Sequence, residues 1–211
     1  MRAMNDIAHQ AARAALSVSI AAPLLFVAAP LCAGAPEPAA VVAHFDDTLL
    51  AAMRGAKTLG YRGRYELLEP AVNETFDVPT MTRVAVGLGW AGLSESQKGR
   101  LTDAFRRFIT ATFAERFDDF GGEKFEIHGA EPITGGILVE NQLVKPDGER
   151  VRINYLTHQT ANGWAAVDIY LDGTVSELAV RRSEFSSILK RSGPEELIAT
   201  LERKTEQLTM N

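Results

Sequence analysis

The sequence contains one cysteine in 211 residues, Cys32, and only four histidines. A lone cysteine near the N-terminus gives the main body of the chain no disulfide and no thiolate ligand, so its stability must come from packing. The histidines are dispersed, and none shows the spacing of a zinc-binding helix. The chain also has no glycine-rich phosphate loop and no nucleophile elbow. The usual signatures of metalloenzymes, nucleotide-binding proteins and serine hydrolases are therefore missing.

Positive charge is also scarce. The 22 lysines and arginines are outnumbered by 27 acidic residues, which gives a formal net charge of −5 at pH 7. This balance argues against nucleic acid or an anionic membrane surface as the main partner. The acidic pairs Asp46-Asp47 and Asp118-Asp119 lie on predicted helices, where neighbours diverge by about 100°. We interpret them as solvated faces, and we expect no metal, no cofactor and no catalytic residue.

The longest apolar run lies at the N-terminus. It spans residues 14–31, follows Arg2 and Arg13, and ends before the small residues Ala33-Gly34-Ala35. This order is typical of a secretory signal peptide, and two prolines inside the run argue against an uncleaved anchor. We predict a signal peptide over residues 1–35. Its removal takes away the cysteine, two arginines and one aspartate, so the exported chain has a net charge of −6.

Residues 36–211 change their hydrophobic period twice. A spacing of three to four predicts helices over 41–59, 61–71, 80–86 and 94–120. A period of two predicts strands over 124–130, 136–145, 150–158 and 164–171. Short turns with Asp-Gly and Asn-Gly between the strands predict an antiparallel meander. Helices over 183–192 and 194–208, divided at Gly193-Pro194, complete a single α+β domain with a curved four-stranded sheet.

Aromatic residues gather in the helix predicted to end near residue 120. Five of the ten phenylalanines lie between 105 and 120, and Ser94 and Gln97 form a capping box at the start. We therefore predict that this is the main core helix. Periodicity alone leaves open whether its apolar face meets a fully packed core or a ligand cavity.

The strand over 164–171 carries one unexpected acid, Asp168. It is either a polar contact in a site or half of a salt bridge on the outer face of the sheet. We favour a salt bridge with Arg150 or Arg152 of the neighbouring strand, since opposite charges are common across strands.

The order of motifs in the C-terminal part resembles a known family. The motifs are Gly163-Trp164, Ser176-Glu177-Leu178-Ala179, Arg181-Arg182-Ser183-Glu184-Phe185, and the series Gly193, Leu197-Ile198, Leu201 and Lys204. Together they resemble the MlaC family of periplasmic lipid carriers, also called toluene-tolerance auxiliary proteins. The Ser-Glu-Leu and Arg-Arg-Ser-Glu-Phe segments are most similar to its hopanoid-biosynthesis-associated branch, HpnM. The resemblance covers roughly residues 40–208.

This resemblance implies a periplasmic carrier of phospholipid or hopanoid. Such a carrier serves an inner-membrane ABC transporter complex and an outer-membrane partner, and it holds lipid tails in an apolar pocket enclosed by sheet and helices. On this interpretation the pocket walls are apolar side chains from the helices and strands: Val84, Leu88, Trp90, Phe105, Phe108, Ile109, Phe113, Ile137, Val139, Ile153, Tyr155, Val167, Ile169, Leu171, Leu178 and Phe185.

Three questions stay open at this stage. Arg181 and Arg182 either contact a lipid headgroup or an acidic docking surface, or they only cap and solvate their helix. An envelope scaffold with a solid core is the alternative to the carrier. A small hydrolase or isomerase, with Asp168, Tyr155 or a histidine as acid or base, is a third hypothesis.

Overall fold

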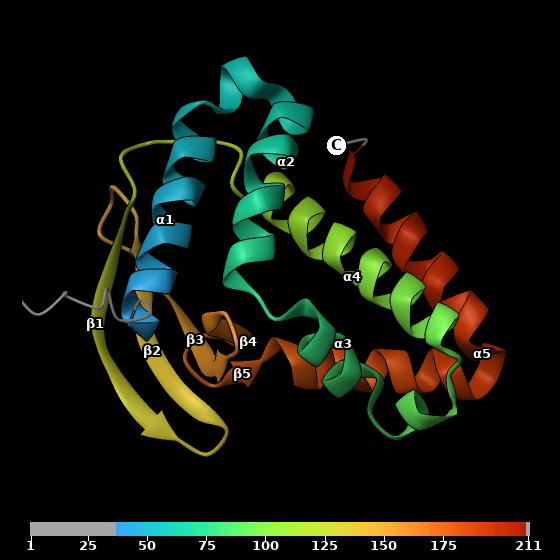
Figure 1. Cartoon of the computed structure of the whole chain (residues 1–211). Helices are drawn as coiled ribbons and strands as arrows, with labels where there is room; N and C mark the ends of the chain where they lie inside the picture. Colours follow the sequence, from blue (N-terminus) through green and yellow to red (C-terminus); the bar gives the residue numbers. More distant parts are fainter. Residues whose placement is uncertain (1–36, 210–211) are drawn as a thin grey trace, which may run out of the picture. The chain divides into compact units, whose positions relative to one another are not determined.

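The computed structural model describes residues 37–209 (Figure 1). The predicted signal peptide, residues 1–35, therefore lies outside the described residues. Within residues 37–209, no helix is both long enough and apolar enough to cross a membrane.

Two helices open the described chain, α1 (Pro38–Arg54) and α2 (Ala56–Thr75). The sequence predicted a single first helix ending at Gly60. Instead, Gly55 already separates α1 from α2, and its N–H donates to the carbonyls of Ala51 and Met53. Gly60 is a kink inside α2, where φ 61° takes the backbone into the region that glycine tolerates best.

Helix α3 (Val78–Val86) begins at Asp77, whose Oδ1 accepts a hydrogen bond from the N–H of Thr80 at 3.0 Å. The short 3₁₀ helix η1 (Gly87–Gly92) then leads to α4 (Glu95–Arg116). The predicted capping box at the start of α4 is confirmed, because Ser94 and Gln97 bond to each other's backbone N–H.

The predicted end of α4 near residue 120 is wrong. Phe117 leaves the helical region, with φ −106° and ψ 62°. Its buried ring stacks on Phe125 at a centroid distance of 6.3 Å, at the beginning of the sheet. The packing of this aromatic pair turns the chain toward the sheet.

The predicted antiparallel meander is confirmed. The strands are β1 (Lys124–Ile133), β2 (Gly136–Val144), β3 (Arg150–Thr160), β4 (Gly163–Leu171) and β5 (Val175–Ser176), in that order across one sheet. The two-residue strand β5 was not predicted. It pairs with the end of β4 and connects directly to the last helix.

Helix α5 (Glu177–Thr209) starts six residues before its predicted position. The predicted division at Gly193-Pro194 is present as a kink, with φ 80° and ψ −179° at Gly193, and the two halves of α5 run in different directions (Figure 1). The second half packs along α4, and the first half lies beside α3.

Asp168 explains the early start of α5. Its carboxylate accepts hydrogen bonds from the N–H of Leu178 at 3.1 Å and from the hydroxyl of Ser176 at 2.5 Å. The predicted salt bridge with Arg150 or Arg152 is wrong, because the register places Leu156 opposite Asp168. A carboxylate that accepts N–H and O–H groups at a helix start stabilises that helix.

The inner face of the sheet follows from the strand register. Directly opposed residues share a face, so Leu143 lies beside Val151, and Ile153 lies beside Leu171. Further along, Tyr155 lies between Val139 and Ile169 on the same face. Helix α1 packs over this second part, where the ring of Phe45 meets that of Tyr155 in an edge-to-face contact at 6.4 Å. The core therefore fills one part of the inner face and leaves the other to a cavity.

Candidate functional site: an apolar cavity with a charged rim

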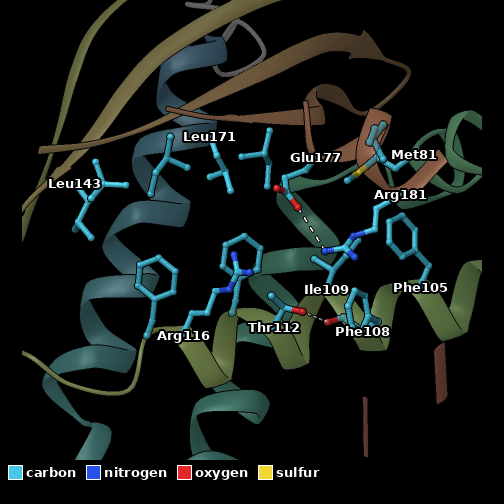
Figure 2. A pocket seen from close by; sticks show the side chains of 16 residues that line it. Met81, Phe105, Phe108, Ile109, Thr112, Arg116, Leu143, Leu171, Glu177 and Arg181 are labelled. Atoms are coloured by element: carbon cyan, nitrogen blue, oxygen red, sulfur yellow. Dashed lines mark hydrogen bonds and ion pairs between the residues drawn. The ribbon is translucent and has the colours of Figure 1, made fainter. Parts of the chain in front are cut away.

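A cavity of about 320 Å³ lies between α4, the inner face of the sheet and the start of α5 (Figure 2). Ligand pockets in proteins usually range from about 300 to 1,000 Å³. Most of the lining is hydrocarbon, and the lining residues are Met81, Phe105, Phe108, Ile109, Thr112, Phe113, Arg116, Phe117, Leu143, Val151, Ile153, Ile169, Leu171, Glu177, Leu178 and Arg181.

Helix α4 provides one wall. Its lining residues recur three and four positions apart from Phe105 to Arg116, which places them on one face of the helix. The hydroxyl of Thr112 donates to the carbonyl of Phe108 at 2.8 Å, so its hydrogen-bonding capacity is used within the helix. This wall therefore presents aromatic and aliphatic surface.

The sheet provides the opposite wall. Its five lining residues are Leu143, Val151, Ile153, Ile169 and Leu171, all on the inner face defined by the register. Leu143, Val151, Ile169 and Leu171 are only partly buried. Large aliphatic side chains that stay partly exposed toward a cavity gain free energy when a hydrocarbon ligand covers them.

Charge is confined to three lining residues, Arg116, Glu177 and Arg181. The guanidinium of Arg181 lies 3.5 Å from Glu177 and 3.2 Å from Glu184, and it stacks over the ring of Phe108 at 5.2 Å (Figure 2). Burial opposes ionisation of Glu184, but Lys204 and Arg181 outweigh it and lower its pKa. The positive charge of Arg181 is thus balanced by neighbouring carboxylates.

Arg116 has a different environment. It is exposed at the last position of α4, and it forms no ion pair with any residue in the range 37–209. Arg116 is therefore a cation on the cavity lining whose charge is not balanced by a carboxylate.

A model of the family described as MlaC protein matches residues 44–203. The chain belongs to the MlaC family. Among solved structures, it is similar to a phospholipid-binding protein from Ralstonia solanacearum, determined in complex with a phospholipid. The two are 21% identical, the match covers 82% of this chain and 99% of the other, and the TM-score is 0.72. At this identity the likeness shows the fold alone.

No curated protein matches the chain. The family model and this structural neighbour do not distinguish the HpnM branch from other MlaC proteins. The MlaC assignment thus rests on the family model, which covers most of the chain.

Half of the predicted wall residues line this cavity of the MlaC domain: Phe105, Phe108, Ile109, Phe113, Ile153, Ile169, Leu171 and Leu178. The other eight do not line it: Val84, Leu88, Trp90, Ile137, Val139, Tyr155, Val167 and Phe185. Of the two predicted headgroup residues, Arg181 lines the cavity and Arg182 does not.

Five of these eight residues fall into two groups with different physical causes. Val139 and Tyr155 have the correct strand phase, but α1 covers them and they are fully buried. Phe185 is also in the core, where it packs behind Phe105 at 5.5 Å. Val84 and Leu88 instead point to solvent, at 41% and 95% exposure.

Sequence reasoning also missed residues that do line the cavity. Leu143 and Val151 have the same strand phase as Ile153, so the alternation of apolar residues could have identified both. Arg116 and Met81 carry no comparable signal, because only the packing of α3 and α4 around the sheet places them at the cavity.

The interpretation of Asp46 as a solvated acid is wrong. Asp46 is buried between α1 and the sheet, where its Oδ1 accepts a hydrogen bond from Asn141 at 3.1 Å. Its Oδ2, the Oδ1 of Asn141 and the hydroxyl of Tyr155 are buried without a hydrogen-bond partner in residues 37–209. Burial, helped by the nearby charge of Asp47 and opposed by the Asn141 bond, raises the pKa of Asp46 to about 8.

The titratable groups do not assemble a catalytic constellation at the cavity. In the described part of the chain, no three His, Cys, Asp or Glu side chains cluster as a metal site would require. His158 does contact Asp77, with Nε2 and Oδ2 2.9 Å apart, but neither lines the cavity. Asp168 is occupied at the start of α5, and Tyr155 lies in the core. The geometry suits binding of an apolar molecule better than acid–base chemistry.

Proposed function

We propose that this MlaC-family protein is a periplasmic lipid carrier. The observation that carries the proposal is the cavity of about 320 Å³, with walls of aromatic and aliphatic side chains and charge only at three residues. The phospholipid bound to the structurally similar protein from Ralstonia solanacearum supports the same assignment. Such a carrier needs no chemistry, because burial of the lipid hydrocarbon contributes about 25 cal/mol per Å² removed from water.

The cavity also favours a carrier over an envelope scaffold. A scaffold needs only a solid core. A cavity lined by partly exposed aliphatic side chains lowers the stability of such a core, and here these side chains are Leu143, Val151, Ile169 and Leu171. Within the proposal, the signal peptide directs export, and an ABC-type transport system of the inner membrane and an outer-membrane partner exchange lipid with the protein.

The charged residues of the cavity lining favour a phosphate-bearing lipid over a neutral hopanoid. Arg116, Arg181 and Glu177 together give the cavity lining a net positive charge, and Arg116 supplies the charge that no carboxylate balances. An arginine binds phosphate through its planar array of N–H donors. In the proposed complex, the tails lie between α4 and the sheet, and the phosphate lies near Arg116.

A transfer assay tests the carrier function. Protein recovered from the periplasmic fraction should move labelled phospholipid from donor to acceptor vesicles, at a rate that rises with protein concentration above the spontaneous exchange. A folded protein that leaves the exchange at its spontaneous rate would contradict the proposal and favour the scaffold.

Replacing Arg116 with glutamine should weaken the binding of an anionic phospholipid about 3- to 10-fold, because one charge-assisted contact with phosphate is lost. The affinity for a neutral hopanoid should stay unchanged. Equilibrium binding of both ligands measures this, with Arg107→Gln on the same helix as a control, since Arg107 contacts Glu202 away from the cavity. Equal losses for both ligands would contradict a phosphate contact.

A further inference from the structure

A second feature of the fold lies where η1 meets α5. The turn reads Gly87-Leu88-Gly89, and Leu88 is 95% exposed. A Cβ atom on Gly87 would lie 3.1 Å from Nε of Arg182, and one on Gly89 would lie 3.3 Å from Cδ1 of Leu189. Side chains of α5 thus occupy the space on either side of Leu88.

The backbone reinforces this arrangement. Gly87 has φ 65°, a conformation that side-chain-bearing residues rarely adopt, so the turn depends on glycine there. With glycines on both sides, Leu88 is the one large side chain of this tripeptide, and it projects into solvent. An exposed leucine forgoes a free energy of about 1.5–3 kcal/mol that burial would provide.

Two cations flank the projecting leucine. A cleft of about 300 Å³ runs between η1 and α5, and it is lined by Val86, Leu88, Gly89, Arg182, Ser186, Leu189 and Lys190. Arg182 and Lys190 form no ion pair with any residue between 37 and 209, whereas the adjacent Arg181 contacts two carboxylates. The chain is acidic overall, with a net charge of −5, but this surface is locally basic.

We propose that the Leu88 patch, defined as Leu88, Arg182, Leu189 and Lys190, docks the protein onto a bilayer surface that carries anionic lipid. Leu88 would enter the boundary between headgroups and acyl chains, and the two cations would lie against the lipid phosphates. The acidic net charge of the chain does not oppose this docking, because attraction to a membrane depends on the charge of the face that approaches it.

The size of the patch favours a bilayer over a protein partner. A stable protein interface buries about 1,000 Å² or more in total, with an apolar centre formed by several side chains. Here one large apolar side chain, Leu88, projects into solvent at the edge of a cleft that it helps to line. A projecting leucine with two flanking cations suits weak, reversible contact with an anionic surface, since each cation adds about 1 kcal/mol to the attraction.

Docking onto a membrane is a separate property from lipid carriage. Arg181 lines the cavity and the adjacent Arg182 belongs to the patch, so docking would hold the start of α5, which lines the cavity, near the membrane surface. Docking itself does not require a loaded cavity, and the two proposals can fail separately.

Binding to vesicles tests the proposal. Protein from the periplasmic fraction is sedimented with vesicles of phosphatidylcholine alone or with added phosphatidylglycerol, at low and high salt. We expect binding to the anionic vesicles that weakens with salt. The double substitution Leu88→Gln/Lys190→Gln should weaken it about 30-fold, since both an apolar and an ionic contact are lost. The matched control is Leu59→Gln/Lys57→Gln, an exposed leucine and lysine on α2, which should bind like the parent.

The results of these experiments distinguish docking of the protein onto vesicles from loading of its cavity with lipid. Equal loss in the two double variants, or equal binding to both kinds of vesicle, would overturn the docking proposal. Binding of the patch to an acidic protein in the absence of vesicle binding would overturn it as well. Loading with detergent-solubilised phospholipid should be the same in the parent and the Leu88→Gln/Lys190→Gln variant. If the parent docks but cannot be loaded, the carrier function fails and the docking proposal stands.

Discussion

Replacing Ile169 with aspartate is expected to abolish lipid loading, with a loss of at least about 100-fold in affinity. Ile169 lies on β4 with its side chain on the cavity wall, and it is only partly buried, so the free protein can solvate the new carboxylate. A bound acyl chain would have to cover that charge, and burying an unpaired carboxylate costs several kcal/mol. Gel filtration after incubation with labelled phospholipid, followed by counting lipid per protein, measures the effect.

Ile133→Asp is the matched control. Ile133 ends β1, is 36% exposed and does not line the cavity. The same change of isoleucine to aspartate should therefore leave loading unchanged. A folded Ile169→Asp variant with a normal lipid load would show that the cavity between α4 and the sheet is not the lipid site.

Replacing Asp46 with asparagine should stabilise the protein at pH 8 much more than at pH 5. The pKa of Asp46 is raised from 3.8 to about 8, chiefly by burial. Between these values the folded state retains a proton that the unfolded state has released, so stability falls as the pH rises toward 8. Asparagine has no proton to lose, so the stability of the variant does not decrease with pH at this position. Its side-chain oxygen still accepts the hydrogen bond from Asn141. The gain at pH 8 should be on the order of several kcal/mol.

Urea unfolding at pH 5 and pH 8 measures the effect as a difference in the free energy of unfolding. The control is Asp47→Asn, a change at the exposed neighbouring carboxylate. It should alter stability by less than about 0.5 kcal/mol at either pH. If the parent and the Asp46→Asn variant lose the same stability between pH 5 and pH 8, Asp46 does not retain its proton in the fold.

The predicted elements that the structure confirms are those with local causes. The capping box at Ser94 and the Gly193-Pro194 division of α5 depend on residues close in sequence. The meander likewise follows from alternation and short turns. The errors arise where distant segments decide the outcome. Phe117 leaves α4 to stack on Phe125 of β1, and α5 begins early because the carboxylate of Asp168 on β4 accepts the N–H of Leu178.

An apolar cavity between sheet and helices was predicted, but only half of the residues predicted to form its walls line it. Strand phase identifies the inner face, yet it cannot say that α1 covers Tyr155 and leaves Ile153 beside a cavity. The burial of Asp46 was missed for the same reason, because its partner Asn141 lies 95 positions away. Exposure of Leu88 also depends on how closely α5 approaches the turn. Long-range packing decides each of these points.

Native mass spectrometry of the protein, purified from its own periplasm without added lipid, tests the central claim most directly. We predict a bound mass that organic extraction identifies as a phospholipid, because the cavity is apolar and the cation Arg116 lies on its lining. A lipid-free mass that stays unchanged after incubation with phospholipid vesicles would contradict the carrier function.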